Sequence, residues 1–112
     1  MTAAVISTSE PERLYSGLSV LVSTAAEGEE CAALLAFGGL ELFLSPLDGE
    51  EPFTRSLREL RETALDLRNL RLYACAASVE LSPAEPELEG LDGVMSTPRF
   101  LREAAGERLL FV

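Results

Sequence analysis

Short apolar runs alternate with helix-length segments along most of this 112-residue chain. Runs of this length and character predict buried strands. They occupy residues 18–23, 40–44, 70–75, 92–96 and 109–112. Strands and helices that alternate in this way form a parallel sheet with right-handed crossovers. We therefore predict an α/β fold, a single-domain three-layer sandwich with a mainly parallel sheet of about five strands and helices on both faces.

Two helices are predicted in the first two thirds of the chain. Thr24-Ala25-Ala26-Glu27 fits a capping box, so a helix is expected from Thr24 to the glycines that follow Phe37. A second helix should begin at Pro52, because proline suits the first helical position. Its apolar residues recur at helical spacing as far as Leu67. Arginines 55, 58 and 61 form a row that is expected to be solvated.

The two ends of the chain carry different signals. Thr97-Pro98 predicts a helix N-cap followed by a first-turn proline, with Gly106 closing that helix. The Pro-rich residues 79–91 predict a short irregular helix or a loop. Residues 1–16 are rich in Ser, Thr, Glu and Pro toward their end, a composition that buries little. We expect 1–16 to be a flexible leader and 17–112 to be the one folded domain.

The charge balance excludes several classes of function. Nineteen acidic and nine basic residues give a formal net charge of −10, which disfavours nucleic acid and anionic membranes as partners. Every cation is Arg, and the chain has no His and no Lys. Catalytic Ser-His or Cys-His pairs, Schiff-base lysines and histidine metal sites are therefore impossible. We expect no metal, no other cofactor and no membrane-spanning segment.

Two cysteines, Cys31 and Cys75, are too few and too far apart for a disulfide scaffold or a zinc site, although one bridge between them stays open. The chain shows no signal-peptide pattern, so a reduced cytoplasmic protein is expected. Cys31 falls on the apolar face of a predicted helix and is interpreted as core packing.

The strongest candidate for chemistry is Cys75, at the carboxyl end of the apolar run 70–75. Ligands of open parallel sheets bind outside the carboxyl ends of the strands. A thiol there that faces backbone N–H groups has a lowered pKa and is more reactive. Ser78 is expected to support it, while Thr24 and Asp48 would shape the entrance. The alternative is that Cys75 is a small buried core residue.

Several segments resemble the DsrE/DsrF-like family. They are Leu72-Tyr73-Ala74-Cys75-Ala76-Ala77-Ser78, Leu91-Asp92-Gly93-Val94, Thr97-Pro98-Arg99-Phe100-Leu101, Val20-Leu21-Val22-Ser23-Thr24-Ala25-Ala26-Glu27 and Leu40-Glu41-Leu42-Phe43-Leu44. The resemblance covers residues 18–112. It implies a small α/β domain that assembles into homotrimers or homohexamers. It also implies that Cys75 carries a persulfide in a sulfur relay, as in dissimilatory sulfur oxidation or tRNA thiolation.

This sequence departs from the family pattern at Ala76, where a glycine is often seen, and in the Pro- and Glu-rich residues 80–89. Two functions are therefore weighed. The first is a sulfur relay, in which Cys75 passes sulfane sulfur between a protein donor and an acceptor, with sulfurtransferase-like activity. The second is a non-enzymatic oligomeric binding or scaffold subunit with a structural Cys75, motivated by the 47% apolar composition.

Overall fold

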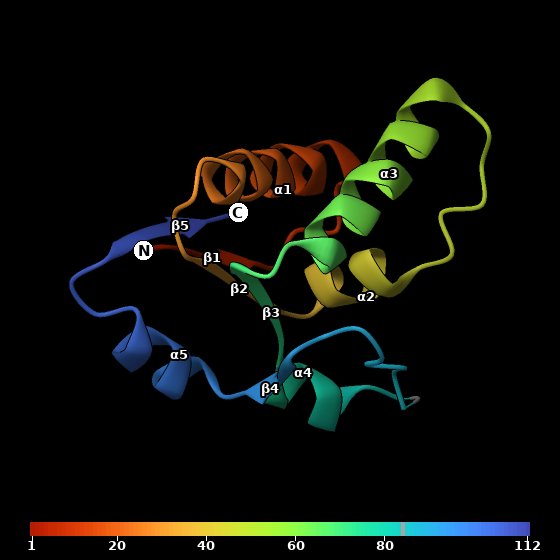
Figure 1. Cartoon of the computed structure of the whole chain (residues 1–112). Coiled ribbons are helices and arrows are strands. Elements are labelled where there is room, and N and C mark those ends of the chain that lie inside the picture. Colours follow the sequence, from red (N-terminus) through yellow and green to blue (C-terminus); the bar gives the residue numbers. More distant parts are fainter. Residues whose placement is uncertain (84) are drawn as a thin grey trace.

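The computed structural model describes residues 1–83 and 85–112 and confirms the predicted α/β class. Five parallel strands form one sheet in the order β4-β3-β2-β1-β5, with helices packed against it (Figure 1). The elements in chain order are β1 (Thr2–Ile6), α1 (Pro11–Ala26), β2 (Cys31–Leu35), α2 (Gly38–Leu44), α3 (Pro52–Asp66), β3 (Leu70–Cys75), α4 (Ala76–Leu81), β4 (Gly93–Met95), α5 (Thr97–Glu103) and β5 (Arg108–Phe111).

The strand β1 corrects the predicted leader. Thr2–Ile6 lies inside the sheet, paired with β2 on one side and with β5 on the other. Ala3, Ala4 and Ile6 are fully buried. Alanine is depleted in strands, and it identifies a buried central strand only through the neighbours that cover it. The fold therefore begins at Thr2, and the predicted boundary at residue 17 falls inside α1.

The elements between residues 18 and 44 are the reverse of those predicted. The expected strand at 18–23 belongs to α1, the expected helix after Thr24 contains β2, and the expected strand at 40–44 is α2. Short aliphatic runs suit either a buried strand or a buried helix, so their apolar character alone does not decide between them. In α1 the deciding feature is the helical spacing of its buried side chains, Leu14, Leu18, Leu21 and Ala25.

From Pro52 onward most predicted elements agree with the structure, but α4 begins directly after β3, where a short irregular helix or a loop was predicted only from residue 79. Pro52 is the first residue of α3, and β3, β4 and β5 lie where the apolar runs predicted strands. The N-cap of α5 is Ser96 rather than the predicted Thr97, because the Ser96 hydroxyl accepts a hydrogen bond from the Arg99 N–H at 3.3 Å. Thr97 is thereby left as the first residue of the helix.

The two faces of the sheet are covered unequally. Buried side chains of α1, α2 and α3 pack on one face, and these helices lie on the same side in Figure 1. On the opposite face Phe100 and Ala104 pack at the seven-residue helix α5 against Leu34, Cys75 and Met95. The thiol of Cys75 therefore belongs to the more thinly covered layer.

Two arginines of the predicted solvated row instead hold the connection between α2 and α3. Arg61 Nη1 donates to the carbonyl oxygens of Phe43, at 3.0 Å, and Ser45. Arg58 Nη1 donates to those of Leu47 and Gly49, at 2.7 and 3.1 Å. Hydrogen bonds from a charged donor to backbone carbonyls are stronger than neutral ones. They keep the segment 45–51 folded back on α3.

Replacing Arg61 with glutamine should therefore destabilise the fold. The shorter amide cannot reach both carbonyls, and we expect the free energy of unfolding to fall by about 1–3 kcal/mol. Urea unfolding followed by circular dichroism measures this change. Arg55→Gln is the matched control, because Arg55 is exposed and makes one contact with the Glu50 carbonyl at 3.2 Å. It should change stability by less than about 0.5 kcal/mol; equal losses would contradict the role given to Arg61.

Candidate functional site

Cys75 is the last residue of β3 and the N-cap of α4. Its backbone is extended, and the chain turns directly from strand to helix at this residue. The first N–H groups of a helix have no intrahelical acceptor, and they point toward the residue that caps it. The predicted position of the thiol, at the carboxyl end of a buried strand and facing backbone amides, is therefore present in the fold.

Hydrogen bonds set the acidity of this thiol. Burial raises the pKa of Cys75, which is 2% exposed, but contacts with Ser78, Thr97 and Ala77 outweigh that effect and lower the pKa below its ordinary value. The contributing groups are the Ser78 hydroxyl and N–H, the Thr97 hydroxyl and the Ala77 N–H. Cys75 Sγ lies 3.7 Å from Thr97 Oγ1. The site thus favours the thiolate more than the surroundings of an ordinary cysteine do.

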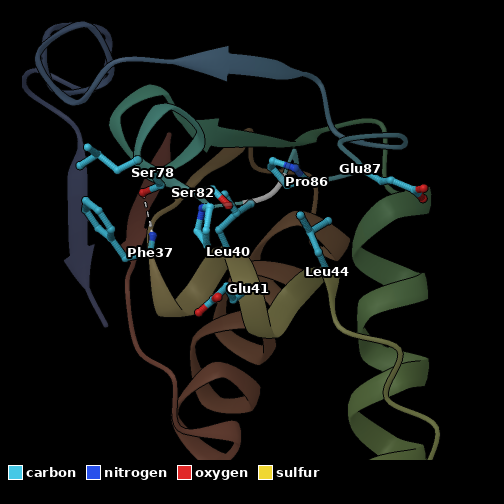
Figure 2. A pocket seen from close by; sticks show the side chains of 10 residues that line it. Phe37, Leu40, Glu41, Leu44, Ser78, Ser82, Pro86 and Glu87 are labelled. Atoms are coloured by element: carbon cyan, nitrogen blue, oxygen red, sulfur yellow. Dashed lines mark hydrogen bonds between the residues drawn. The ribbon is translucent and has the colours of Figure 1, made fainter.

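The orientation of the Ser78 hydroxyl is fixed from the far side. Ser78 is buried, and its Oγ accepts a hydrogen bond from the Phe37 N–H at 2.8 Å (Figure 2). A serine hydroxyl has a single proton, and a lone pair that accepts from Phe37 leaves this proton available for another acceptor. The thiolate of Cys75 is such an acceptor. Phe37, Ser78 and Cys75 therefore form one chain of hydrogen-bonding groups.

Cys31 has the opposite character. It begins β2, where it pairs with Leu70, five residues before Cys75 in β3. At roughly 3.3 Å per strand residue, the two cysteines stand about 16 Å apart along the sheet. Both are free thiols, and no bridge joins them. Burial, and then the nearby Glu29 carboxylate, raise the pKa of Cys31. Its interpretation as core packing agrees with its burial, although it lies in a strand rather than a helix.

Two predicted site residues lie elsewhere. Thr24 was expected after the carboxyl end of a strand, but it lies in the last turn of α1, where its hydroxyl donates to the Val20 carbonyl at 2.7 Å. Asp48 was expected in a loop leaving a strand, but that loop leaves the helix α2 and Asp48 is exposed there. Neither residue is among the groups that set the pKa of Cys75. Of the predicted supporting residues, the structure brings only Ser78 to the thiol.

Two groups at the site were not predicted as part of it. Thr97 follows β4 closely, and its hydroxyl becomes available to Cys75 because Ser96 takes the capping position. The signal for Thr97 was present, since a hydroxyl after a strand end of a parallel sheet lies near the other strand ends. The N–H of Phe37 had no such signal, because its position depends on the turn from β2 to α2.

A cavity of about 470 Å³ lies beside Ser78 at the carboxyl edge of the sheet, between α2, α4 and the segment that follows α4. Figure 2 shows the side chains around it. Its apolar lining consists of Phe37, Leu40, Leu44, Leu81, Pro83 and Pro86. Its polar lining consists of Glu41, Ser78, Ser82 and Glu87. Cys75 does not line this cavity, but Ser78 links the two.

Comparison with known proteins adds no assignment. No family model matches the sequence, and no characterised protein matches it at a significant level. The resemblance to the DsrE/DsrF-like family thus stands on the residues that carry it. Within residues 1–83 and 85–112, no three His, Cys, Asp or Glu side chains are placed to hold a metal ion together. None of the helices in that same part of the chain has the length and apolar character that crossing a membrane requires.

The Ser78→Ala variant should raise the pKa of Cys75. Loss of the Ser78 hydroxyl removes a hydrogen bond that favours the Cys75 thiolate. The alkylation rate of Cys75 should therefore rise at a higher pH than in the parent protein. The Phe37 N–H also loses its acceptor, and we expect the unfolding free energy to fall by about 1–3 kcal/mol.

Iodoacetamide alkylation across a pH series, in a Cys31→Ser background, measures the first effect, and urea unfolding measures the second. Ser16→Ala is the control, because the exposed Ser16 hydroxyl contacts only the Glu12 carbonyl of its own helix, at 3.1 Å. Coincident pH profiles for Ser78→Ala and Ser16→Ala would rule out this role of Ser78.

Proposed function

We propose that this protein is a sulfur-relay protein that carries sulfane sulfur as a persulfide on Cys75. The observation that supports the proposal most directly is the set of hydroxyl and N–H groups around one thiol, which lower its pKa against the effect of burial. The resemblance to the DsrE/DsrF-like family points to the same residue. Reduced thiols of this kind persist in the cytoplasm, which is where we place the protein.

The transfer is a thiol exchange that balances without an added oxidant. The Cys75 thiolate attacks the outer sulfur of a donor persulfide, a new S–S bond forms on Cys75, and the donor leaves as a thiolate. In the reverse sense, an acceptor thiolate takes the outer sulfur and returns Cys75 to its thiolate form. The donors around Cys75, among them Ser78 and Thr97, would stabilise the negative sulfur in both states.

Access to the thiol requires a small local movement. Cys75 is almost fully buried, yet Ala77 and Thr97 beside it are exposed, so the cover over the sulfur is about one residue thick. Both belong to short helices, α4 and α5, and α5 lies at the thinly covered side of the sheet. A donor protein that shifts either helix would expose Cys75 without opening the larger core under α1 and α3.

Intact-protein mass spectrometry tests the proposal. The reduced protein is incubated with a small polysulfide or with a persulfide-loaded carrier protein, and peptide mapping locates any adduct. We expect a gain of about 32 Da, one sulfur atom, on Cys75 and its loss on treatment with a reducing thiol. A chain that stays unmodified under conditions that load a known carrier would refute the relay.

A second candidate is the oligomeric scaffold with a structural Cys75. Apolar side chains are exposed at both edges of the sheet, with Val94 47% exposed on β4 and Phe111 73% exposed on β5. Exposed apolar side chains at a sheet edge are available for contact with another subunit, and the resemblance implies a homotrimer or homohexamer. Native mass spectrometry reports the oligomer, and a Cys75 that resists labelling until denaturation would favour this function over the relay.

A further inference from the structure

The charged residues that line the cavity beside Ser78 are all acidic. Half of the cavity's lining residues are leucine or proline, and its only charged lining residues in the described chain are Glu41 and Glu87. Both glutamates are exposed, so they stand at the mouth rather than in the interior. A cavity of about 470 Å³ lies within the size range of small-molecule sites. An apolar interior with a negative rim is complementary to an apolar molecule that ends in a positive charge.

Phe37 adds a second feature that points to a ligand. It is 52% exposed, and its backbone has φ 47° and ψ −117°, a conformation that a residue with a side chain rarely adopts. The conformation is enforced from both sides, by the hydrogen bond to Ser78 and by the close packing of Gly39 on the Ile6 carbonyl. Strain of this kind is concentrated at ligand sites. Here it holds an aromatic ring at the cavity wall, where a cation can lie against its face.

We propose that this cavity binds a small organic cation, an amine or ammonium compound with an aliphatic or aromatic body. The body would lie against Leu40, Leu44 and Leu81, and the positive end would lie between the ring of Phe37 and the carboxylate of Glu41. Glu87 lies at the far end of the cavity from Phe37 (Figure 2), where its carboxylate adds to the negative charge of the rim. Burial of the apolar body supplies most of the affinity, and the negative carboxylates at the rim favour a positively charged ligand over a negatively charged one. The site does not include Cys75 and does not depend on the sulfur-relay function.

Three probes with one apolar body test the proposal: 4-phenylbutylamine, 4-phenylbutanol and 4-phenylbutyrate. They are titrated into the methyl-labelled protein, and binding is followed by the chemical shifts of Leu40, Leu44 and Leu81. We expect the amine to bind most tightly and the carboxylate least, with about two- to fivefold between successive probes, as exposed charge pairs give. Added salt should reduce these ratios.

Variants at exposed positions locate the effect without unfolding the chain. Glu41→Gln should weaken amine binding and leave alcohol binding unchanged, and Glu87→Gln, which removes the more distant carboxylate, should have a smaller effect in the same direction. Leu81 is 73% exposed, and Leu81→Arg should reverse the preference in favour of the carboxylate. Glu59→Gln, an exposed carboxylate on α3 outside the cavity, is the control for net charge. Equal affinities for all three probes, or shifts confined to other methyl groups, would overturn the proposal. A Cys75→Ser protein should bind the amine normally, which separates this test from that of sulfur loading.

Discussion

The Cys75→Ser variant is expected to load sulfane sulfur at least about 100-fold more slowly than the parent, because a serine hydroxyl has no thiolate form to attack the donor. The substitution replaces sulfur with oxygen in a site that already contains the Ser78 and Thr97 hydroxyls, so the fold should persist. Initial rates of adduct formation, measured by mass spectrometry with a polysulfide donor, give the ratio directly.

The Cys31→Ser variant is the matched control, since it removes the other thiol and should leave the loading rate unchanged. The pH profile adds a second criterion. Because the pKa of Cys75 is lowered and that of Cys31 is raised, modification should become fast at a lower pH for Cys75 than for Cys31. A variant lacking Cys75 that still loads at the parental rate, or a reversed order of the two profiles, would contradict the assignment of the reactive thiol.

Gly39→Ala is expected to be the most destabilising single substitution considered. A Cβ at Gly39 would overlap the backbone carbonyl oxygen of Ile6 and lie 2.8 Å from its carbonyl carbon. The Ile6 carbonyl is backbone at the end of β1, and the added Cβ is attached to the backbone of α2. The overlap can therefore be relieved only if α2 and β1 move apart. We expect a loss of about 3 kcal/mol or more in unfolding free energy, comparable with severe overpacking of a core. Thermal and urea unfolding measure it.

Gly49→Ala is the control for this prediction. A Cβ at Gly49 would meet the carboxylate end of the Glu51 side chain, which can rotate away into solvent, and no positive φ is required there. The substitution should change stability by less than about 1 kcal/mol. Similar losses for both glycines would show that the approach of α2 to β1 is not as close as the structure indicates.

The sequence predicted the fold class and the second half of the chain better than the first half. Between Pro52 and Phe111 every element except α4 has its own signal, such as the proline at the start of α3 or the apolar run of β3. In the first 44 residues the strand β2 consists of cysteine, alanine and leucine, while the helix α1 carries the β-branched residues Val20, Val22 and Thr24. Local propensity there favours the wrong element, and tertiary burial decides the outcome.

The candidate site also divides into residues that the sequence placed correctly and residues that it placed wrongly. Cys75 was predictable because its position depends only on β3, and Ser78 follows it closely enough in the chain to lie beside it in the first turn of α4. Thr24 and Asp48 were misplaced because their positions depended on two strands that are helices in the structure. The contribution of the Phe37 N–H could not be predicted, because it depends on a backbone conformation rather than on a side chain.

If Cys75 carries sulfur as proposed, the position of Cys31 and Cys75 at opposite ends of two neighbouring strands bears on how that sulfur is released. Cys75 is the only cysteine at the carboxyl end of the strands. A chain with a persulfide on Cys75 would therefore have no second thiol of its own that could release the outer sulfur as sulfide. The outer sulfur would stay on Cys75 until a thiol of another molecule removes it. Under oxidising conditions the same geometry allows Cys75 to form disulfides only between molecules, so non-reducing electrophoresis should show covalent dimers or mixed adducts rather than a compact oxidised monomer.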